Sequence, residues 1–229
     1  MRVVGHRGAS RAFPENTIAA FEGAIAQGAD GVELDVRRTL DDAMAVHHDD
    51  ALADGRIIVE SRLDDLPPSV PVLADVLRVC APLSIVNIEI KNWPDDRDFD
   101  PEARLAGEVV GLLESRGELG DGRALVSCFH LPTIDLVHEI APGLATAWLL
   151  GLVEHPEQLI DTAAAHGHVA VHPHHAFVDE AFVAAAHAAG LAVNVWTVDD
   201  PERIRQLADM GADAVVTNVP DIALKALGR

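Results

Sequence analysis

The sequence predicts an α/β fold, a (β/α)8 barrel of the TIM type, that takes up the whole chain of 229 residues. Short runs rich in β-branched residues alternate with Ala-rich amphipathic segments, which is typical of parallel βαβ units. Eight such pairs occur along the chain, and this number favours a closed barrel over an open sheet. The length is also ordinary for one barrel of roughly 250 residues, so residues 1–229 are expected to form a single domain.

The expected elements alternate in the order strand, then helix. Strands are expected at residues 2–5, 31–36, 84–90, 124–128, 145–149, 168–172, 193–197 and 214–217. Helices are expected at residues 15–27, 73–80, 102–116, 131–140, 156–166, 178–189, 200–210 and 220–227. Gly28, Gly190 and Gly211 each follow a predicted helix, where a left-handed C-terminal cap favours glycine.

The connection after the second strand breaks this alternation. The four residues 40–43, between the short runs 36–39 and 44–47, are too few for a crossover helix, since a parallel connection needs a dozen residues or more. We interpret the segment as a β-hairpin that stands above the barrel mouth and returns the chain at His48. Residues 49–72 contain several prolines, and we expect them to form a loop rather than a separate domain.

The formal net charge of −20 argues against nucleic acid or an anionic membrane surface as a partner. Binding to either requires a basic patch on the protein. If the substrate carries a phosphate group, local cations must override the negative field of the whole chain. Arginine, lysine or a bound metal ion are the available sources of that positive charge.

Cysteine usage and the N-terminus both favour a cytoplasmic protein. Cys80 and Cys128 have no motif spacing, so we expect reduced core residues and no disulfide framework. The chain enters a strand at residue 2, which leaves no room for a signal peptide. The apolar runs fall short of the roughly 20 residues that a membrane span needs, so no stable membrane anchoring is expected.

Acidic residues gather on one face of the second and third predicted strands. Glu33 and Asp35 are two residues apart, as are Glu89 and Lys91, so each pair points to the same side of its strand. Three carboxylates in one barrel mouth repel each other unless a partner compensates their charge. A hard divalent cation, Mg2+ or Ca2+, is the simplest partner for oxygen ligands. The alternative is a salt-bridge network with Arg7 and Lys91, or carboxyl groups with raised pKa values.

The end of the first strand carries a second candidate group, His6-Arg7-Gly8. Barrel enzymes keep their catalytic groups where strands give way to loops. Arginine suits bidentate phosphate binding, and glycine permits a ligand to approach the backbone closely. Glu15 and Asn16 follow at the start of a predicted helix, and we interpret both as helix-capping residues.

Histidines supply two more candidates. One of His47 and His48, at the end of the predicted hairpin, is expected to act as a base or an acid near neutral pH. A second group comprises His166, His168, His172, His174 and His175. This group could bind metal, but we interpret it mostly as surface composition, with His172 at a strand end as the one candidate member of the site. Zinc is a rival metal, but the chain shows no other motif of spaced histidine ligands.

In these residues the chain resembles the glycerophosphodiester phosphodiesterases along nearly its whole length. The matching phrases are His6-Arg7-Gly8, Pro14-Glu15-Asn16-Thr17, Glu33-Leu34-Asp35, His48-Asp49, Glu89-Ile90-Lys91, Ser127-Cys128-Phe129, Val195-Trp196-Thr197-Val198 and Thr217-Asn218. Their common order, rather than any single phrase, carries the resemblance. The resemblance implies a barrel fold, in agreement with the strand count.

The resemblance also implies a division of roles within the site. Glu33, Asp35 and Glu89 match the metal ligands of the family. His6 and His48 match its catalytic acid and base, in an order that the sequence leaves open. The implied cofactor is a divalent metal, Mg2+ or Ca2+.

Three further residues match substrate-binding positions. Arg7 matches the phosphate contact of the family, Lys91 lies beside its metal site, and Trp196 matches an aromatic residue of the substrate pocket. The last strand departs from the family pattern, because Thr217-Asn218 stands where Thr-Asp is common. The loop after His48 also lacks the family's Arg-Thr-Thr phrase and is shorter.

We therefore expect metal-dependent hydrolysis of a glycerophosphodiester to sn-glycerol 3-phosphate and an alcohol. A related phosphodiesterase that acts on lysophospholipids or other diesters, and a non-catalytic barrel that binds phosphate ligands, are the alternatives. No serine or cysteine lies in a nucleophile motif, so water, a histidine or the glycerol 2-hydroxyl must attack phosphorus. The glycerol 2-hydroxyl is favoured because the substrate itself holds this group close to phosphorus. The expected partner is the small substrate alone, and the sequence does not indicate an oligomeric state.

Overall fold

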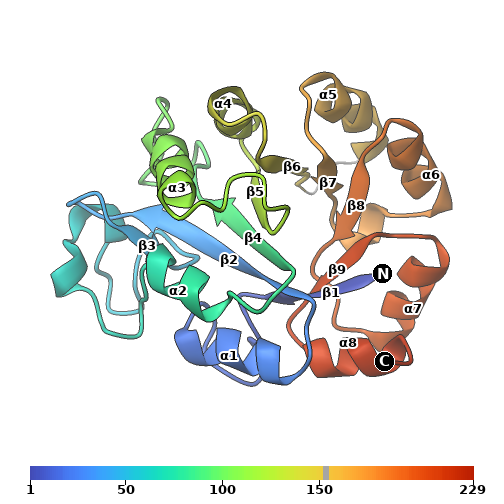
Figure 1. Cartoon of the computed structure of the whole chain (residues 1–229), viewed down its shortest axis with the longest axis horizontal. Helices are drawn as coiled ribbons and strands as arrows, with labels where there is room; N and C mark the ends of the chain where they lie inside the picture. Colours follow the sequence, from blue (N-terminus) through green and yellow to red (C-terminus); the bar gives the residue numbers. More distant parts are fainter. Residues whose placement is uncertain (152–154) are drawn as a thin grey trace.

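Eight parallel strands close into a barrel in a computed structural model that describes residues 1–151 and 155–229 (Figure 1). The ring consists of β1 (Arg2–His6), β2 (Gly31–Arg38), β4 (Ile85–Ile90), β5 (Ala124–Cys128), β6 (Ala145–Leu149), β7 (Ala170–His172), β8 (Ala192–Val195) and β9 (Ala214–Thr217). β1 pairs with β2 on one side and with β9 on the other, which closes the ring. The predicted (β/α)8 barrel is confirmed.

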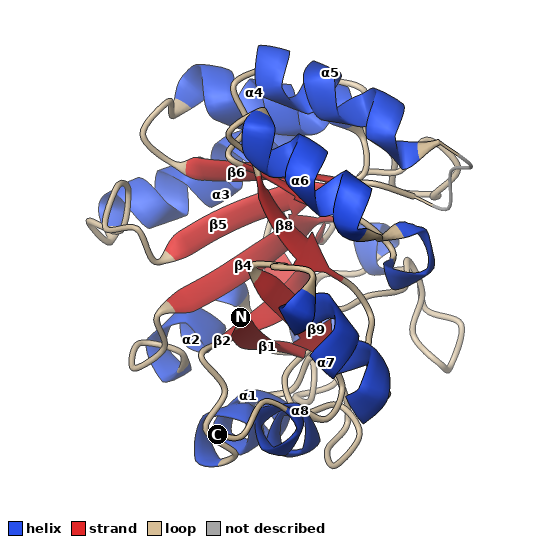
Figure 2. Cartoon of the chain, turned by 90° about the vertical axis from the view of Figure 1, so that its right-hand side faces the viewer, coloured by secondary structure: helices blue, strands red, loops and turns tan. Residues whose placement is uncertain are grey.

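Helices cover the outside of this barrel (Figure 2). They are α1 (Ile18–Ala26), α2 (Leu73–Val79), α3 (Arg104–Ser115), α4 (Leu131–Ile140), α5 (Ile160–Ala165), α6 (Glu180–Ala188), α7 (Pro201–Asp209) and α8 (Pro220–Ala226). Short 3-10 helices lie at η1 (Ile58–Glu60), η2 (Leu63–Asp65), η3 (Pro156–Leu159) and η4 (His175–Phe177). Most predicted boundaries are correct to within three residues, but the helix expected at 156–166 is divided into η3 and α5.

The main core lies between the strands and the helices. In β2, the outward-facing Val32, Leu34 and Val36 are all fully buried, as the alternation of the strand predicts. Complete burial of such side chains stabilises the fold by about 1.5–3 kcal/mol each. The alternate residues of the same strand face the barrel interior, so this packing also fixes the direction in which Glu33 and Asp35 point.

The predicted hairpin after the second barrel strand is present. β3 (Met44–Val46) pairs antiparallel with the end of β2, with Val46 opposite Val36. The turn contains Asp42 with a φ of 59°, a left-handed conformation that aspartate tolerates better than most residues. The loop that follows has a small core of its own, formed by Ala45, Leu52, Ile58 and Leu66. This core holds the connection to α2 against the hairpin.

The start of α1 differs from the prediction. Thr17 is the N-cap, and its hydroxyl accepts a backbone N–H of the first turn. Asn16 adopts a left-handed φ of 56° and is buried, with its amide nitrogen donating to Asp35 Oδ2 at 2.7 Å. Glu15 instead pairs with Arg7 at 2.9 Å. The interpretation of Glu15 and Asn16 as helix caps is therefore wrong, because both side chains have partners elsewhere in the fold.

Glycine caps and buried cysteines agree with the sequence. Gly28, Gly190 and Gly211 have φ values of 87°, 81° and 89°, as left-handed C-terminal caps require. Cys80 and Cys128 are free and buried, and burial raises the pKa of each thiol to about 12. Both cysteines are therefore packing residues rather than nucleophiles.

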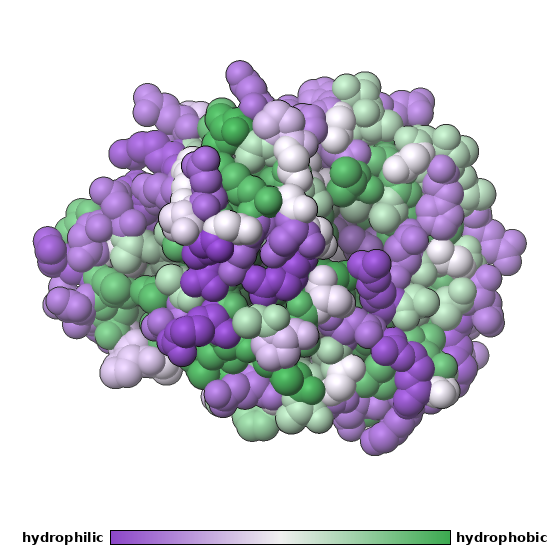
Figure 3. Space-filling view, viewed as in Figure 1, coloured by the Kyte–Doolittle hydropathy of each residue, from purple (hydrophilic) through white to green (hydrophobic). Residues whose placement is uncertain are grey.

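The surface is a mixture of hydrophilic residues and small apolar patches on the face shown in Figure 3. Acidic residues outnumber basic ones in the whole chain by 37 to 17. Within the described residues, none of the helices has the length and apolar character that crossing a membrane requires.

Inside the barrel, His172 at the end of β7 is held on two sides. Its Nε2 lies 2.9 Å from the side-chain nitrogen of Asn194, and its backbone carbonyl accepts the indole N–H of Trp196 at 2.7 Å. The residue is only 2% exposed. Burial lowers the pKa of His172 to about 3, so the imidazole is neutral over the physiological range.

Replacement of His172 should change how stability depends on pH. The folded pKa lies below the ordinary 6.5, so between about pH 6.5 and pH 3 the unfolded chain binds the extra proton. Protonation of His172 in the unfolded chain therefore lowers the free energy of unfolding of the protein as the pH falls through that window. Relative to His172→Gln, the wild-type protein should lose about 2 kcal/mol between pH 7.5 and pH 5 in urea unfolding. Identical pH dependence of the two proteins would contradict the buried neutral state.

Candidate active site

The candidate site lies at the C-terminal ends of the strands, where β1, β2 and β4 are adjacent. The strand register places His6 opposite Glu33 and Asp35 opposite Glu89. Residues in register on parallel strands point to the same face, so these four side chains converge. The barrel end that carries them is also the end at which barrel enzymes bind their substrates.

Three carboxylates form the centre of the site. Glu33, Asp35 and Glu89 each offer an oxygen atom within 4.8 Å of the others. Their exposed fractions are 3%, 0% and 7%, so water screens their mutual repulsion only weakly. Three buried negative charges at this distance require nearby positive charge to remain ionised.

Two cations supply part of that charge. Lys91 Nζ lies 2.5 Å from Glu89 Oε1 and 2.9 Å from Asp35 Oδ1. Arg7 Nε lies 3.2 Å from Asp35 Oδ2. Arg7 has a left-handed φ of 54°, an unfavourable conformation for arginine, which turns its backbone N–H toward Glu33 Oε2 at 3.0 Å. The salt-bridge network considered from the sequence is therefore present, and Asp35 is its best-paired member.

The carboxyl groups respond unequally to this environment. Burial raises the pKa of Glu33 well above its usual range, and the charges of Asp35 and Glu89 raise it further. Burial also raises the pKa of Glu89. For Asp35, burial raises the pKa, but Lys91 and Arg7 lower it by more, so it lies below its usual range. Glu33 is therefore the carboxyl group whose negative charge the neighbouring cations compensate least.

The donor set fits a hard divalent cation. Glu33 Oε1 and Asn87 Oδ1 are buried and accept no hydrogen bond from the described residues. An unpartnered buried oxygen costs about 1–3 kcal/mol, which a metal contact would offset. The three carboxylates carry one formal negative charge more than Lys91 and Arg7 together. Mg2+ or Ca2+ would turn that balance to one positive charge, and both ions prefer oxygen ligands.

His6 is oriented by residues from the far end of the chain. Its Nδ1 lies 2.7 Å from Asn218 Oδ1, while the amide nitrogen of Asn218 donates to Asp199 Oδ2 at 2.8 Å. A carboxylate only accepts, so Asn218 must present its oxygen to His6, and His6 donates from Nδ1. The other nitrogen, Nε2, lies 4.0 Å from Glu33 Oε2 and lacks a proton in the neutral ring. Burial and then Arg7 lower the pKa of His6, which favours this neutral form.

His48 is held in place through its backbone. Its carbonyl accepts the Nε–H of Arg37 at 2.8 Å, and Arg37 is fixed in turn by Asp98, whose oxygens lie 2.6 and 2.7 Å from Nη1. The ring Nδ1 of His48 lies 2.7 Å from Asp49 Oδ1. His47 differs, because its Nδ1 faces the backbone carbonyl of Asp49 at 2.9 Å and the residue does not line the cavities.

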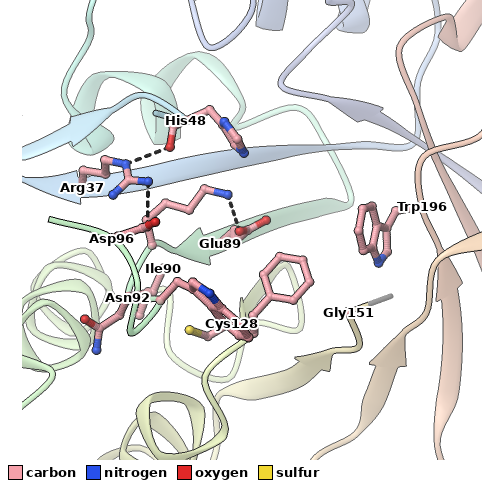
Figure 4. Close-up of a pocket in the computed structure, with 12 residues that line it drawn as sticks. Arg37, His48, Glu89, Ile90, Asn92, Asp96, Cys128, Gly151 and Trp196 are labelled. Carbon is pink, nitrogen blue, oxygen red and sulfur yellow. Dashed lines mark hydrogen bonds and ion pairs between the residues drawn. The ribbon is translucent and has the colours of Figure 1, made fainter. Parts of the chain in front are cut away.

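Two adjoining cavities open over the carboxylates. The inner one, of about 210 Å³, contains the predicted site residues His6, Arg7, Glu33, His48, Glu89, Lys91, His172 and Trp196 in its wall. The outer one, of about 340 Å³, shares His48, Glu89, Lys91 and Trp196 with it. Figure 4 shows His48, Glu89 and Trp196 on different sides of this common space. Asp35 lies beneath it, bound to Lys91 and Arg7.

One side of the outer cavity is aromatic. Phe129 lies between Trp93 and Trp196, with ring centroids 6.0 and 5.6 Å away and both contacts edge to face. Trp93 is 46% exposed, which is unusual for a side chain of this size. Arg37 and Asp96 also line this cavity, and in Figure 4 they lie on the side away from Trp196, so the cavity has both apolar and charged parts in its wall.

The sequence analysis missed three residues that shape the site. Arg37 continues the period-two face of Glu33 and Asp35, so the pattern that identified the carboxylates also contained it. Phe129 lies in a matched phrase but was not assigned a role. Asn218 was noted only as a departure from the family pattern, although it orients His6.

The second group of histidines is divided by the fold. His172 lines the inner cavity, and His174 packs against Trp196 with ring centroids 5.2 Å apart. His168 is buried beside Thr146 on the outside of the barrel strands, away from the carboxylates. The interpretation of this group as mostly surface composition is therefore wrong for His168, because the chain turns its ring inward before β7 begins.

Comparisons with known proteins show the family to which this chain is similar. The chain matches the family model described as "Glycerophosphoryl diester phosphodiesterase family" over residues 6–67 and 55–222. It is 30% identical over 247 residues to a glycerophosphodiester phosphodiesterase of Bacillus altitudinis, with 98% of this chain and 97% of that protein covered.

Solved structures show the same fold. A glycerophosphodiester phosphodiesterase from Thermotoga maritima has a TM-score of 0.82 at 27% identity, covering 100% of this chain and 98% of that one. An Oleispira antarctica phosphodiesterase, solved with the product sn-glycerol-3-phosphate, has a TM-score of 0.89 at 24% identity, covering 100% and 97%. On the extent of these matches, the chain belongs to the glycerophosphoryl diester phosphodiesterase family.

Proposed function

We propose that this chain hydrolyses glycerophosphodiesters to sn-glycerol 3-phosphate and an alcohol, with the help of a divalent metal. The observation that carries the proposal is the buried group of three carboxylates, flanked by two cations and facing a cavity with two histidines. The family membership and the name of the Bacillus altitudinis relative support it. The Oleispira antarctica protein, whose structure contains sn-glycerol-3-phosphate, has the same fold.

Glu33, Asp35 and Glu89 would hold the metal, which supplies Lewis acid chemistry at the phosphoryl oxygens when bound. Arg7 and Lys91 border the same cavity and would bind the phosphate. This local arrangement accounts for how a chain of net charge −20 accepts an anionic substrate. The same net charge supports a small substrate, rather than nucleic acid or an anchoring membrane, as the partner.

We assign different roles to the two histidines. His6 presents a bare Nε2 to the cavity because its Nδ1–H is bound to Asn218, and it would accept a proton from the attacking group. The glycerol 2-hydroxyl remains our hypothesis for that group. His48 has the Asp49 carboxylate 2.7 Å from its Nδ1, which orients the ring, and it would donate a proton to the leaving alcohol.

The aromatic wall would bind the alcohol part of the substrate. Trp93, Phe129 and Trp196 present apolar surface next to the catalytic cavity, which favours diesters whose alcohol has an apolar portion. Lysophospholipids share the phosphate and glycerol groups and differ in the apolar part. The retained histidine pair favours catalysis over simple binding of phosphate ligands.

Removal of the metal should abolish turnover and lower the melting temperature. The carboxylates of Glu33, Asp35 and Glu89 repel each other without a cation, so the metal-free fold is less stable. Activity against a glycerophosphodiester and thermal unfolding would be measured after chelation, then again after Mg2+ or Ca2+ is restored. Full turnover by metal-free protein would show that the cluster is only a salt-bridge network.

The two histidines should be distinguishable by substrate. His6→Ala and His48→Ala should each lower turnover by roughly 10²–10⁴-fold, the usual contribution of a general acid or base. With a p-nitrophenyl diester, whose leaving group needs no proton, the defect of His48→Ala should shrink while that of His6→Ala persists. His47→Ala is the control, because this neighbour faces Asp49 and should retain most activity. Equal losses at His47 and His48 would show that the assignment is wrong.

The role of the aromatic wall can be tested at its exposed end. Trp93→Ala should raise KM by several-fold to about tenfold for diesters with an apolar alcohol, and less for small polar alcohols. Ile140→Ala is a matched control, since this residue is 45% exposed but does not line the cavities. An equal change in KM across the substrate panel would refute a selective alcohol-binding role.

A further inference from the structure

A second group of metal-ligating side chains lies outside the active site. Asp135 belongs to α4, while His166 and His168 belong to the connection between α5 and β7. Figures 1 and 2 both show α4 and α5 side by side on the outside of the barrel. The three residues therefore connect α4 to the segment after α5. They lie near the N-terminal end of β7, at the opposite end of the barrel from the carboxylates.

The geometry of the three side chains is convergent. His166 Nδ1 lies 2.9 Å from both carboxylate oxygens of Asp135, and His168 Nε2 lies 3.1 Å from Asp135 Oδ1. One ligand atom from each residue lies within 4.8 Å of those from the other two. Tetrahedral coordination with bonds of about 2.1 Å places ligand atoms roughly 3.4 Å apart. For a cation to bind, the two separations between histidine nitrogen and Asp135 oxygen would need to widen by only a fraction of an ångström.

The buried member of the group is already oriented. The side chain of His168 is fully buried, and its Nδ1 lies 3.0 Å from the hydroxyl of Thr146, which is also fully buried. If Nδ1 donates its proton to that hydroxyl, Nε2 is left to bind a metal. A second ring nitrogen fixed in this way is the usual arrangement of histidine ligands.

Gly167 forms the tight turn that lies between His166 and His168. It has a left-handed φ of 82°, and a Cβ at this position would lie 2.6 Å from Nε2 of His138. His138 lies one turn after Asp135 on α4 and contacts the His168 ring edge to face, at 6.1 Å between centroids. Side chains from α4 thus surround the turn closely, which holds His166 and His168 near Asp135.

We propose that Asp135, His166 and His168 form a binding site for a divalent transition metal, with Zn2+ as the best fit. Two imidazole nitrogens and one carboxylate oxygen suit zinc, whereas Mg2+ and Ca2+ prefer the all-oxygen set of the active site. Asp135 and His166 are partly exposed, so an ion can enter and retain a water molecule. Since the site lies away from the barrel mouth, its role is to tie α4 to the α5–β7 connection rather than to catalyse.

The site can be tested by titrating the Mg2+-loaded protein with Co2+, without any other transition metal present. Sites of low coordination number give Co2+ an intense visible absorption, whereas six-coordinate sites of carboxylates and water absorb only weakly. We expect one Co2+ per chain with this spectrum, its displacement by Zn2+, and a Zn2+-dependent rise in melting temperature. Asp135→Asn and His166→Gln should each weaken Zn2+ binding by at least about tenfold, because each removes a ligand.

Two control variants make the test specific. His187→Gln removes an equally exposed histidine that also pairs with an aspartate, Asp213, at 2.9 Å, but belongs to no three-ligand group among the described residues, so this variant should bind Zn2+ like the wild type. Glu89→Gln alters the active site and should leave the Co2+ spectrum unchanged. His166 is 40% exposed in its side chain, so its replacement should leave the fold intact. The proposal is overturned if no such spectrum develops, or if His166→Gln binds Zn2+ as tightly as the wild type.

Discussion

The mutual repulsion of three buried carboxylates is the constraint around which this barrel end is built. Packing of Val32, Leu34 and Val36 against the helices forces Glu33 and Asp35 inward, and the register of β2 with β4 adds Glu89. Desolvation of each charge costs several kcal/mol if it remains unpaired. The apolar core and the acidic cluster are therefore two consequences of the same strand alternation.

The neighbouring backbone is arranged to compensate these charges. Arg7 and Asn16 both adopt left-handed conformations, which are unfavourable for arginine and better tolerated by asparagine. In return, Arg7 brings its backbone N–H to Glu33 and its guanidinium to Asp35, while Asn16 donates to Asp35. The loop between β1 and α1 is thus shaped by the carboxylates below it, and Asn16, which was expected only to cap the following helix, is part of that arrangement.

The hairpin after β2 holds His48 in place beside the cavity. Because β2 continues beyond the barrel, Arg37 can bind the His48 carbonyl and Asp98 at once. A buried guanidinium with several charged partners holds a loop more rigidly than exposed ion pairs do. Arg37 lines the same outer cavity as Trp93 and Phe129, so this cavity can contact polar and apolar parts of one substrate.

The sequence by itself predicted the barrel and the hairpin, because these depend on short-range periodicity, while the resemblance to the family supplied most of the candidate site residues. A period of two along β2 is enough to place Glu33 and Asp35 on one face, and it also includes Arg37. Only the tertiary structure decided how those residues are held. Asn218 lies 212 residues from His6 and reaches it only because β9 closes the ring beside β1. Likewise, the local sequence around Asn16 and His168 gives no sign of their partners. The fold buries Asn16 beside Asp35 and His168 beside Thr146. Hydrogen-bond partners distant in the chain leave no periodic pattern, so propensity and spacing cannot reveal them.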